Sequence, residues 1–242
     1  MLGTLILAGL ACGALLTTAG FALWHALRPL RGLAQAVQGL GWLAGALSLS
    51  SALSAWLNAG DFAPCVPHLL LMAALAAPAD PYHPVIPWNG FLRLLPPLAL
   101  AWAGLLCAAT PVGTGASGPL VSGGPPALGL ELAVVVCGGL GARALGQAFG
   151  EAVTSAPGLT WSSAAAYAWL TVLLGGVALV SLVRRGSVWD GTSAEVALAS
   201  VWLVWSAVWL SLRRPSRLRA ALTCVAAAFL IALAARWPLP PA

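Results

Sequence analysis

The chain has 242 residues, of which 60% are hydrophobic and only 7% are charged. A soluble globular domain carries about 25% charged residues, so this composition excludes an ordinary cytosolic enzyme. The mean hydropathy is +0.93, and uncharged stretches reach the roughly 20 residues that a helix needs to cross a bilayer. We therefore predict an all-α fold, a polytopic bundle of transmembrane helices that forms one integral membrane domain over residues 1–242.

Seven apolar runs are long enough to cross a membrane by this measure: 2–26, 36–57, 91–109, 127–149, 163–183, 195–212 and 218–236. An eighth run at 65–79 is shorter and is flanked by prolines. If it counts as a span, the arginines of 28–31 and of 213–219 fall on the same side, as the enrichment of cytoplasmic loops in arginine requires. We therefore expect about eight spans in the plasma (inner) membrane, with both termini outside the cytoplasm.

The positive charge and the cysteines have plain interpretations. All eleven basic residues are arginines, and the net charge is +5. In a membrane protein this excess reports topology, so we expect lipid as a partner and no nucleic acid. The five cysteines show no CxxC spacing, which favours small packing residues over a disulfide framework or a metal site.

Three pairs of glycines four residues apart predict close approach of neighbouring helices. They are Gly9 with Gly13, Gly41 with Gly45, and Gly146 with Gly150.

No known catalytic pattern occurs in the chain: HExxH, a Walker loop and GxSxG with a partner histidine are all missing. We predict no catalytic residues, and a binding, assembly or structural role rather than an enzyme. The histidines His25, His68 and His83 lie near predicted span ends or in a loop, where interfacial polar residues are common.

Ionisable groups within spans are costly and deserve more weight. Arg143, Gln147 and Glu151 follow one another at intervals of four residues, which indicates a polar stripe that holds helices together. Glu131 lies about 18 Å from Arg143 along the helix, so its partner must come from elsewhere, for example from Arg184 or Arg185.

Tryptophan is unusually frequent, with twelve residues in the chain. Trp202, Trp205 and Trp209 recur at helical spacing and share one face of their helix. The face is either a packing ridge or a platform for a flat apolar ligand with acidic tails, such as a porphyrin.

Residues 186–214, GSVWDGTSAEVALASVWLVWSAVWLSLRR, resemble a tryptophan-rich loop and the helix after it in a known family. The family is that of the cytochrome c assembly proteins (CcsA/CcmC-type), which handle haem. In these proteins a WGxxWxWD segment on the outer membrane face precedes an acidic residue, a tryptophan-containing span and a basic inner loop. Trp189, Asp190 and Glu195 stand at matching positions here. Two positions that are histidine in the family are Glu131 and Ser211 in this chain.

The resemblance implies a membrane protein that holds haem at the outer, non-cytoplasmic face for a cytochrome c maturation partner. Arginines would pair with the haem propionates, and Glu131 or His68 would approach the iron. The implied cofactor-binding residues are Trp189, Asp190, Arg184, Arg185, Glu131, Glu195, Trp202 and His68. Because both family histidines are replaced, the alternative is a non-catalytic integral subunit of a larger respiratory or photosynthetic complex on the same scaffold.

Overall fold

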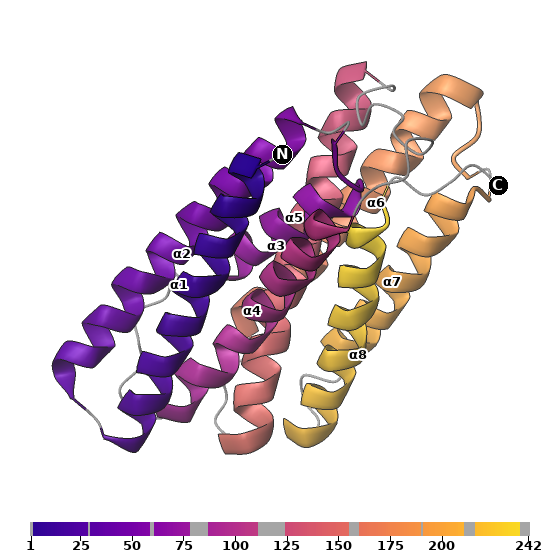
Figure 1. Cartoon of the computed structure of the whole chain (residues 1–242). Helices are drawn as coiled ribbons and strands as arrows, with labels where there is room; N and C mark the ends of the chain where they lie inside the picture. Colours follow the sequence, from indigo (N-terminus) through magenta and orange to yellow (C-terminus); the bar gives the residue numbers. More distant parts are fainter. Residues whose placement is uncertain are drawn as a thin grey trace.

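The computed structural model describes residues 2–28, 30–58, 61–77, 87–110, 124–154, 160–189, 191–210 and 216–237. Within these ranges the chain forms eight α-helices and no strands (Figure 1). They are α1 (Leu2–Leu27), α2 (Arg31–Leu57), α3 (Cys65–Ala76), α4 (Pro87–Ala109), α5 (Gly124–Thr154), α6 (Thr160–Arg185), α7 (Ser193–Leu210) and α8 (Ser216–Ala235). The predicted all-α bundle is confirmed, with one helix for each apolar run.

Seven of these helices are long and apolar enough to cross a membrane, and the exception is α3. With 12 residues, α3 is about 18 Å long, against a hydrocarbon core of about 30 Å. The chain is therefore an integral membrane protein in which the proline-flanked run forms a helix shorter than a full span.

Successive helices nevertheless alternate in direction. In Figure 1 α1 begins and α8 ends toward the upper end of the bundle, while α1 ends and α2, α4 and α8 begin at the lower end. The chain thus starts α3 at one end and starts α4 at the other. This alternation agrees with the expected eight-span order, in which both termini lie on the same side.

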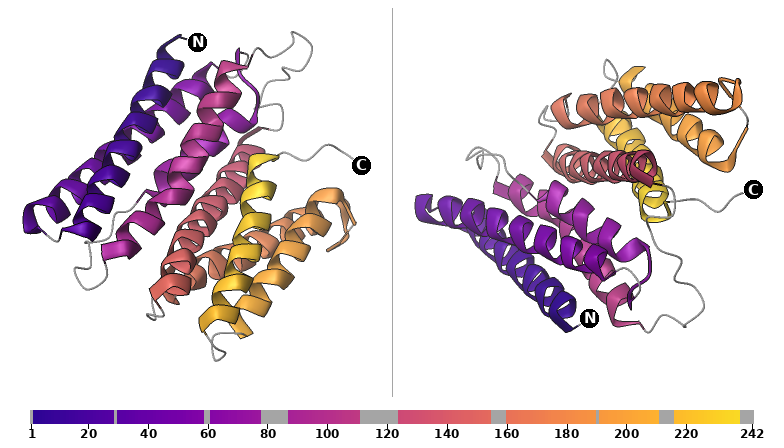
Figure 2. Two further views of the ribbon diagram at one scale, coloured as in Figure 1. Left: turned by 60° about the horizontal axis from the view of Figure 1, so that its bottom comes forward. Right: turned by 90° about the horizontal axis from the view of Figure 1, so that it is seen from above.

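Helix α5 joins the two halves of the bundle. It packs against α3 and α4 on one side and against α6 and α8 on the other, and the view from above shows it between the two groups (Figure 2). Its most hydropathic stretch is 61% buried, whereas that of α6 is only 22% buried. Residues on α5 are therefore shielded from lipid, while α6 presents most of its surface outward.

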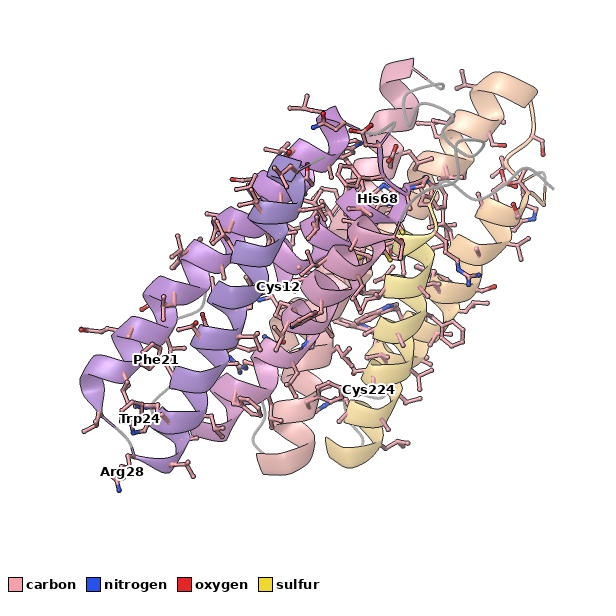
Figure 3. The ribbon with its side chains drawn as sticks, viewed as in Figure 1. Cys12, Phe21, Trp24, Arg28, His68 and Cys224 are labelled. Atoms are coloured by element: carbon pink, nitrogen blue, oxygen red, sulfur yellow. The ribbon has the colours of Figure 1, made fainter. Side chains whose placement is uncertain are left out.

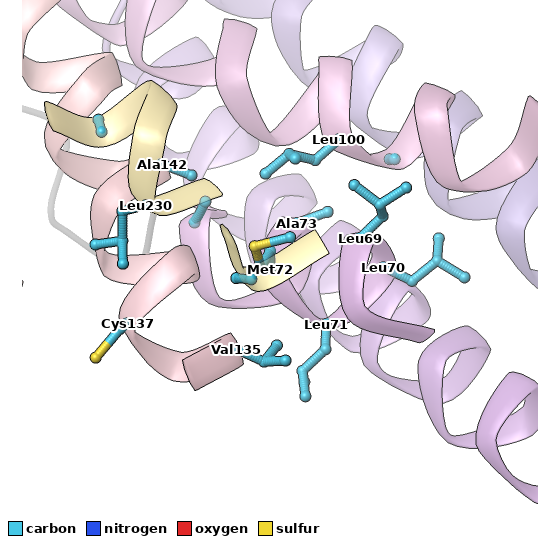
Figure 4. Close-up of a cluster of buried hydrophobic side chains, with 14 of the residues drawn as sticks. Leu69, Leu70, Leu71, Met72, Ala73, Leu100, Val135, Cys137, Ala142 and Leu230 are labelled. Atoms are coloured by element: carbon cyan, nitrogen blue, oxygen red, sulfur yellow. The ribbon is translucent and has the colours of Figure 1, made fainter. Parts of the chain in front are cut away.

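The short helix α3 lies in the core of the N-terminal half. Its residues from Val66 to Ala73 are all buried, and they pack among side chains of α4, α5 and α8 (Figure 4). Gly138 of α5 makes room for this contact, because a Cβ there would lie 2.4 Å from Met72 Sδ and 2.6 Å from Ala234 Cβ. A helix enclosed by protein can be shorter than the bilayer because its ends do not have to meet water through lipid.

The glycine pairs do not all serve the predicted purpose. Gly146 does: a Cβ there would lie 2.9 Å from the carbonyl oxygen of Arg93, so α4 and α5 meet backbone to backbone. Gly9 and Gly13 do not, because nothing lies within 4 Å of a Cβ at either position. The prediction that this first pair packs against a neighbouring helix of the chain is wrong, since α1 turns its other face inward.

Candidate functional site

A buried pair of ionisable side chains connects α3 with α5. His68 Nε2 lies 2.7 Å from Glu131 Oε1. The histidine side chain is 0% exposed and the glutamate side chain 4% exposed. Figure 3 shows His68 in the upper half of the bundle, where α3 begins. The pair is placed by helix packing, because its members are 63 residues apart in sequence.

The two side chains satisfy each other in low-dielectric surroundings, where an unpaired buried charge costs several kcal/mol. Among the described residues the second ring nitrogen, His68 Nδ1, has no hydrogen-bond partner. His68 thus has one ring nitrogen bound to Glu131 and one without a partner in the described part of the chain.

This geometry corrects two expectations from the sequence. His68 is not an interfacial residue but one of the most deeply buried side chains. The partner of Glu131 is His68, so no arginine at the end of α6 is needed to balance it. His25 is buried as well, and His83 lies outside the described residues.

The upper ends of α6 and α7 carry most of the other expected site residues. Helix α6 ends at Arg185, followed by Gly186 with φ of 75°, a left-handed conformation that favours glycine after a helix. Ser187 Oγ accepts a hydrogen bond from the Trp189 N–H (3.2 Å) and donates one to the Trp189 carbonyl (2.8 Å). Trp189 is 47% exposed in this turn. Asp190 and the side chains of Arg184 and Arg185 lie outside the described residues.

Glu195 has a local structural role. Its Oε2 accepts a hydrogen bond from the Thr192 N–H (3.0 Å), and its own N–H donates to Thr192 Oγ1 (3.3 Å). This reciprocal arrangement is a capping box, which satisfies N–H groups at the start of a helix. The carboxylate expected at a ligand site therefore stabilises the beginning of α7.

The tryptophan face of α7 is occupied by protein. Tyr167 of α6 stacks on Trp202 (centroids 6.1 Å apart) and on Trp209 (5.7 Å apart). The indole N–H of Trp202 donates to Thr171 Oγ1 at 3.0 Å, and Trp205 is buried in the core. These contacts support the packing-ridge interpretation. Sequence reasoning missed Tyr167, although Tyr167 and Thr171 are one helical turn apart on the same face of α6.

The expected site residues therefore do not form one site. His68 and Glu131 lie in the core, where α3 packs against α2, α4, α5 and α8. Trp189 and Glu195 lie at the α6–α7 end, and Trp202 lies midway along α7 against Tyr167 and Thr171. Within the described part of the chain, no three His, Cys, Asp or Glu side chains are grouped as a metal ion would need. The arrangement presents the Trp189 ring at one end of the bundle and a hydrogen-bonded histidine–glutamate pair inside it.

Comparisons with known proteins give no match: no protein-family model, no curated protein and no solved structure is similar to the chain. The likeness to the cytochrome c assembly family therefore rests on the sequence patterns alone.

Proposed function

We propose that this integral membrane protein holds haem at the α6–α7 end for cytochrome c maturation. The observation that carries the proposal is the position of Trp189. Its side chain is half exposed, in a turn that hydrogen bonds to Ser187 hold in place. The turn directly follows the end of α6, which is formed by Arg184 and Arg185. An aromatic ring beside basic residues suits a flat apolar ligand with carboxylate tails. The same combination motivated the family resemblance.

The parts of the ligand would be divided among these residues as follows. The Trp189 indole would cover one face of the porphyrin and exclude water from it. The guanidinium groups of Arg184 and Arg185 would donate hydrogen bonds to the two propionates, since arginine and carboxylate form paired charge-assisted hydrogen bonds. When bound, haem supplies the vinyl groups that a maturation partner attaches to an apocytochrome.

The buried pair does not fit an axial ligand. His68 Nε2 is hydrogen-bonded to Glu131 and its side chain is fully enclosed. Glu131 is occupied by the same contact. The proposal therefore uses only the periphery of the haem, and it assigns no iron ligand to this chain.

The experiment is haem binding by the purified protein in detergent, followed through its Soret absorption. Trp189→Ala should weaken haem binding by about tenfold or more, which corresponds to about 1.4 kcal/mol. Replacing both Arg184 and Arg185 by Gln should weaken it at least as much, because a hydrogen bond to a charged group is worth roughly 1.5–3 kcal/mol. Trp42→Ala is the matched control, since Trp42 is 58% exposed on α2. Equal binding by all four proteins, or no binding by any, would refute the proposal.

The second candidate function is a non-catalytic subunit of a larger membrane complex. It is favoured by the open face of α1, where Gly9 and Gly13 leave space for a backbone that none of the described residues fills. Such small-residue faces let helices of different chains approach closely in membranes. Stable co-purification of further membrane subunits, lost in a Gly9→Leu/Gly13→Leu variant, would support this function, whereas a monodisperse single chain in mild detergent would argue against it.

For localisation we propose the plasma (inner) membrane, with the Trp189 turn on the non-cytoplasmic side. Arg28 follows α1 directly, Arg31 begins α2, and Arg93 and Arg219 lie in early turns of α4 and α8, so these four belong to the lower end of the bundle. Arg184, Arg185 and Arg236 lie at the upper end. Arginine is enriched on the cytoplasmic side of membrane proteins. Its distribution therefore supports a cytoplasmic lower end.

A further inference from the structure

Two cysteines from different helices meet at the upper end of the N-terminal half. Cys65 is the first residue of α3, and Cys107 lies in the last turn of α4. Cys107 is the neighbouring thiol that acts on the Cys65 side chain. Both thiols are free and partly exposed, whereas Cys12 and Cys137 are buried.

The packing of α3 on α4 gives independent support for this contact. A Cβ at Gly104 would lie 3.0 Å from the Leu70 side chain and 3.5 Å from Leu69 Cβ, so Gly104 lies opposite these two leucines. The helices run in opposite directions. About one turn from this contact toward the upper end of the bundle, Cys65 on α3 therefore lies opposite Cys107 on α4.

Both cysteine backbones are held in place. The chain enters α3 through Pro64, and the Val66 N–H donates to the Ala63 carbonyl at 3.0 Å. At the end of α4, Thr110 Oγ1 donates to the Cys107 carbonyl at 2.7 Å. These contacts hold the backbone at each cysteine, which matters because disulfide geometry is specific.

We propose that Cys65 and Cys107 form a reversible disulfide that fastens the start of α3 to the end of α4. The oxidant is a disulfide, either of a small molecule or of a partner protein. One cysteine thiolate attacks a sulfur of that disulfide, which gives a mixed disulfide and releases one thiol. The second cysteine thiolate then attacks the mixed disulfide, forms the Cys65–Cys107 bond and releases the second thiol. Two electrons and two protons pass from the cysteine pair to the oxidant.

The bond would fix the helix that carries the buried histidine. His68 follows Cys65 by three residues, so it lies one turn away on the same side of α3. The bond would also close the chain between Cys65 and Cys107, which limits the unfolded state. Oxidation is therefore expected to raise the stability of the region around the His68–Glu131 pair.

The test uses a full-length variant with Cys12, Cys137 and Cys224 replaced by alanine, purified in detergent. It is treated with dipyridyl disulfide, and free thiols are then counted with a polyethylene-glycol maleimide that shifts the protein on a gel. The expected result is loss of both shifts, no pyridyl adduct in the intact mass, and recovery of both shifts after reduction. The matched control keeps Cys65 and Cys224 instead, because Cys224 lies in the lower half of the bundle (Figure 3). It should carry one pyridyl adduct on each cysteine.

A Cys65–Cys107 protein that carries pyridyl adducts like the control, or that forms disulfide-linked dimers, would overturn the proposal. The single variants Cys65→Ser and Cys107→Ser, made in the wild-type background, provide a second measurement. In wild-type protein, oxidation should raise the midpoint of thermal unfolding, and each serine variant should abolish that rise. An equal rise in the variants would also overturn the proposal.

Discussion

At the scale of single residues, the most consequential contact is that between His68 and Glu131. Each side chain alone would place an unpaired polar or charged group in the core, and such groups cost several kcal/mol. Together they satisfy each other at 2.7 Å. The pair should therefore behave as a unit, in which the loss of one member is worse than the loss of both.

His68→Leu should lower the free energy of unfolding by about 3–5 kcal/mol, because Glu131 would remain buried without its partner. The double variant His68→Leu/Glu131→Leu should recover most of this loss, since two apolar groups of similar size can replace a buried pair. The free energies come from reversible unfolding in mixed detergent micelles. If the free-energy losses of the single variants His68→Leu and Glu131→Leu simply add in the double variant, the two side chains are not coupled.

At the scale of helices, glycines show where two helices pack closely and where a helix surface is open. Gly146 lies against the Arg93 backbone, which cannot move without separating α4 from α5. Gly9 sits on the outward face of α1 with no neighbour. The same substitution at these two positions should therefore have opposite consequences.

Gly146→Ala should destabilise the protein by about 1–3 kcal/mol through overpacking. Gly9→Ala is the control and should be neutral or slightly stabilising, because alanine favours the helix over glycine by up to about 1 kcal/mol. The midpoints of thermal unfolding in detergent test both. Equal effects of the two changes would contradict the packing described for α4 and α5.

The sequence predicts elements better than contacts for clear physical reasons. Apolar runs predict all eight helices because lipid requires long hydrophobic segments. The capping box of α7 could also have been predicted, because Thr-Ser-Ala-Glu at 192–195 matches the sequence pattern of such boxes. The His68–Glu131 pair and the Cys65–Cys107 contact could not be predicted, because they depend on how α3 packs between α4 and α5. No local pattern encodes that packing.

At the scale of the whole molecule, the alternation of helix direction makes a prediction about sides. The test introduces a single cysteine into a cysteine-free protein, at Ser187 or at Arg28. On intact cells, a membrane-impermeant maleimide should label one of these two variants and not the other. Ser187→Cys should be labelled and Arg28→Cys should be labelled only after lysis, since the two lie at opposite ends of the bundle. Labelling of both on intact cells would contradict the alternation, and the reverse pattern would contradict the proposed orientation.

The short length of α3 also bears on how the protein is made. A nascent chain that has been synthesised only as far as α4 contains His68 but not Glu131, which follows 63 residues later. Partition of α3 into lipid at that moment would carry an uncompensated imidazole in a helix that is too short to cross. We therefore expect α3 to take its buried place only after α5 has been made, so that the third helix is installed after the fifth.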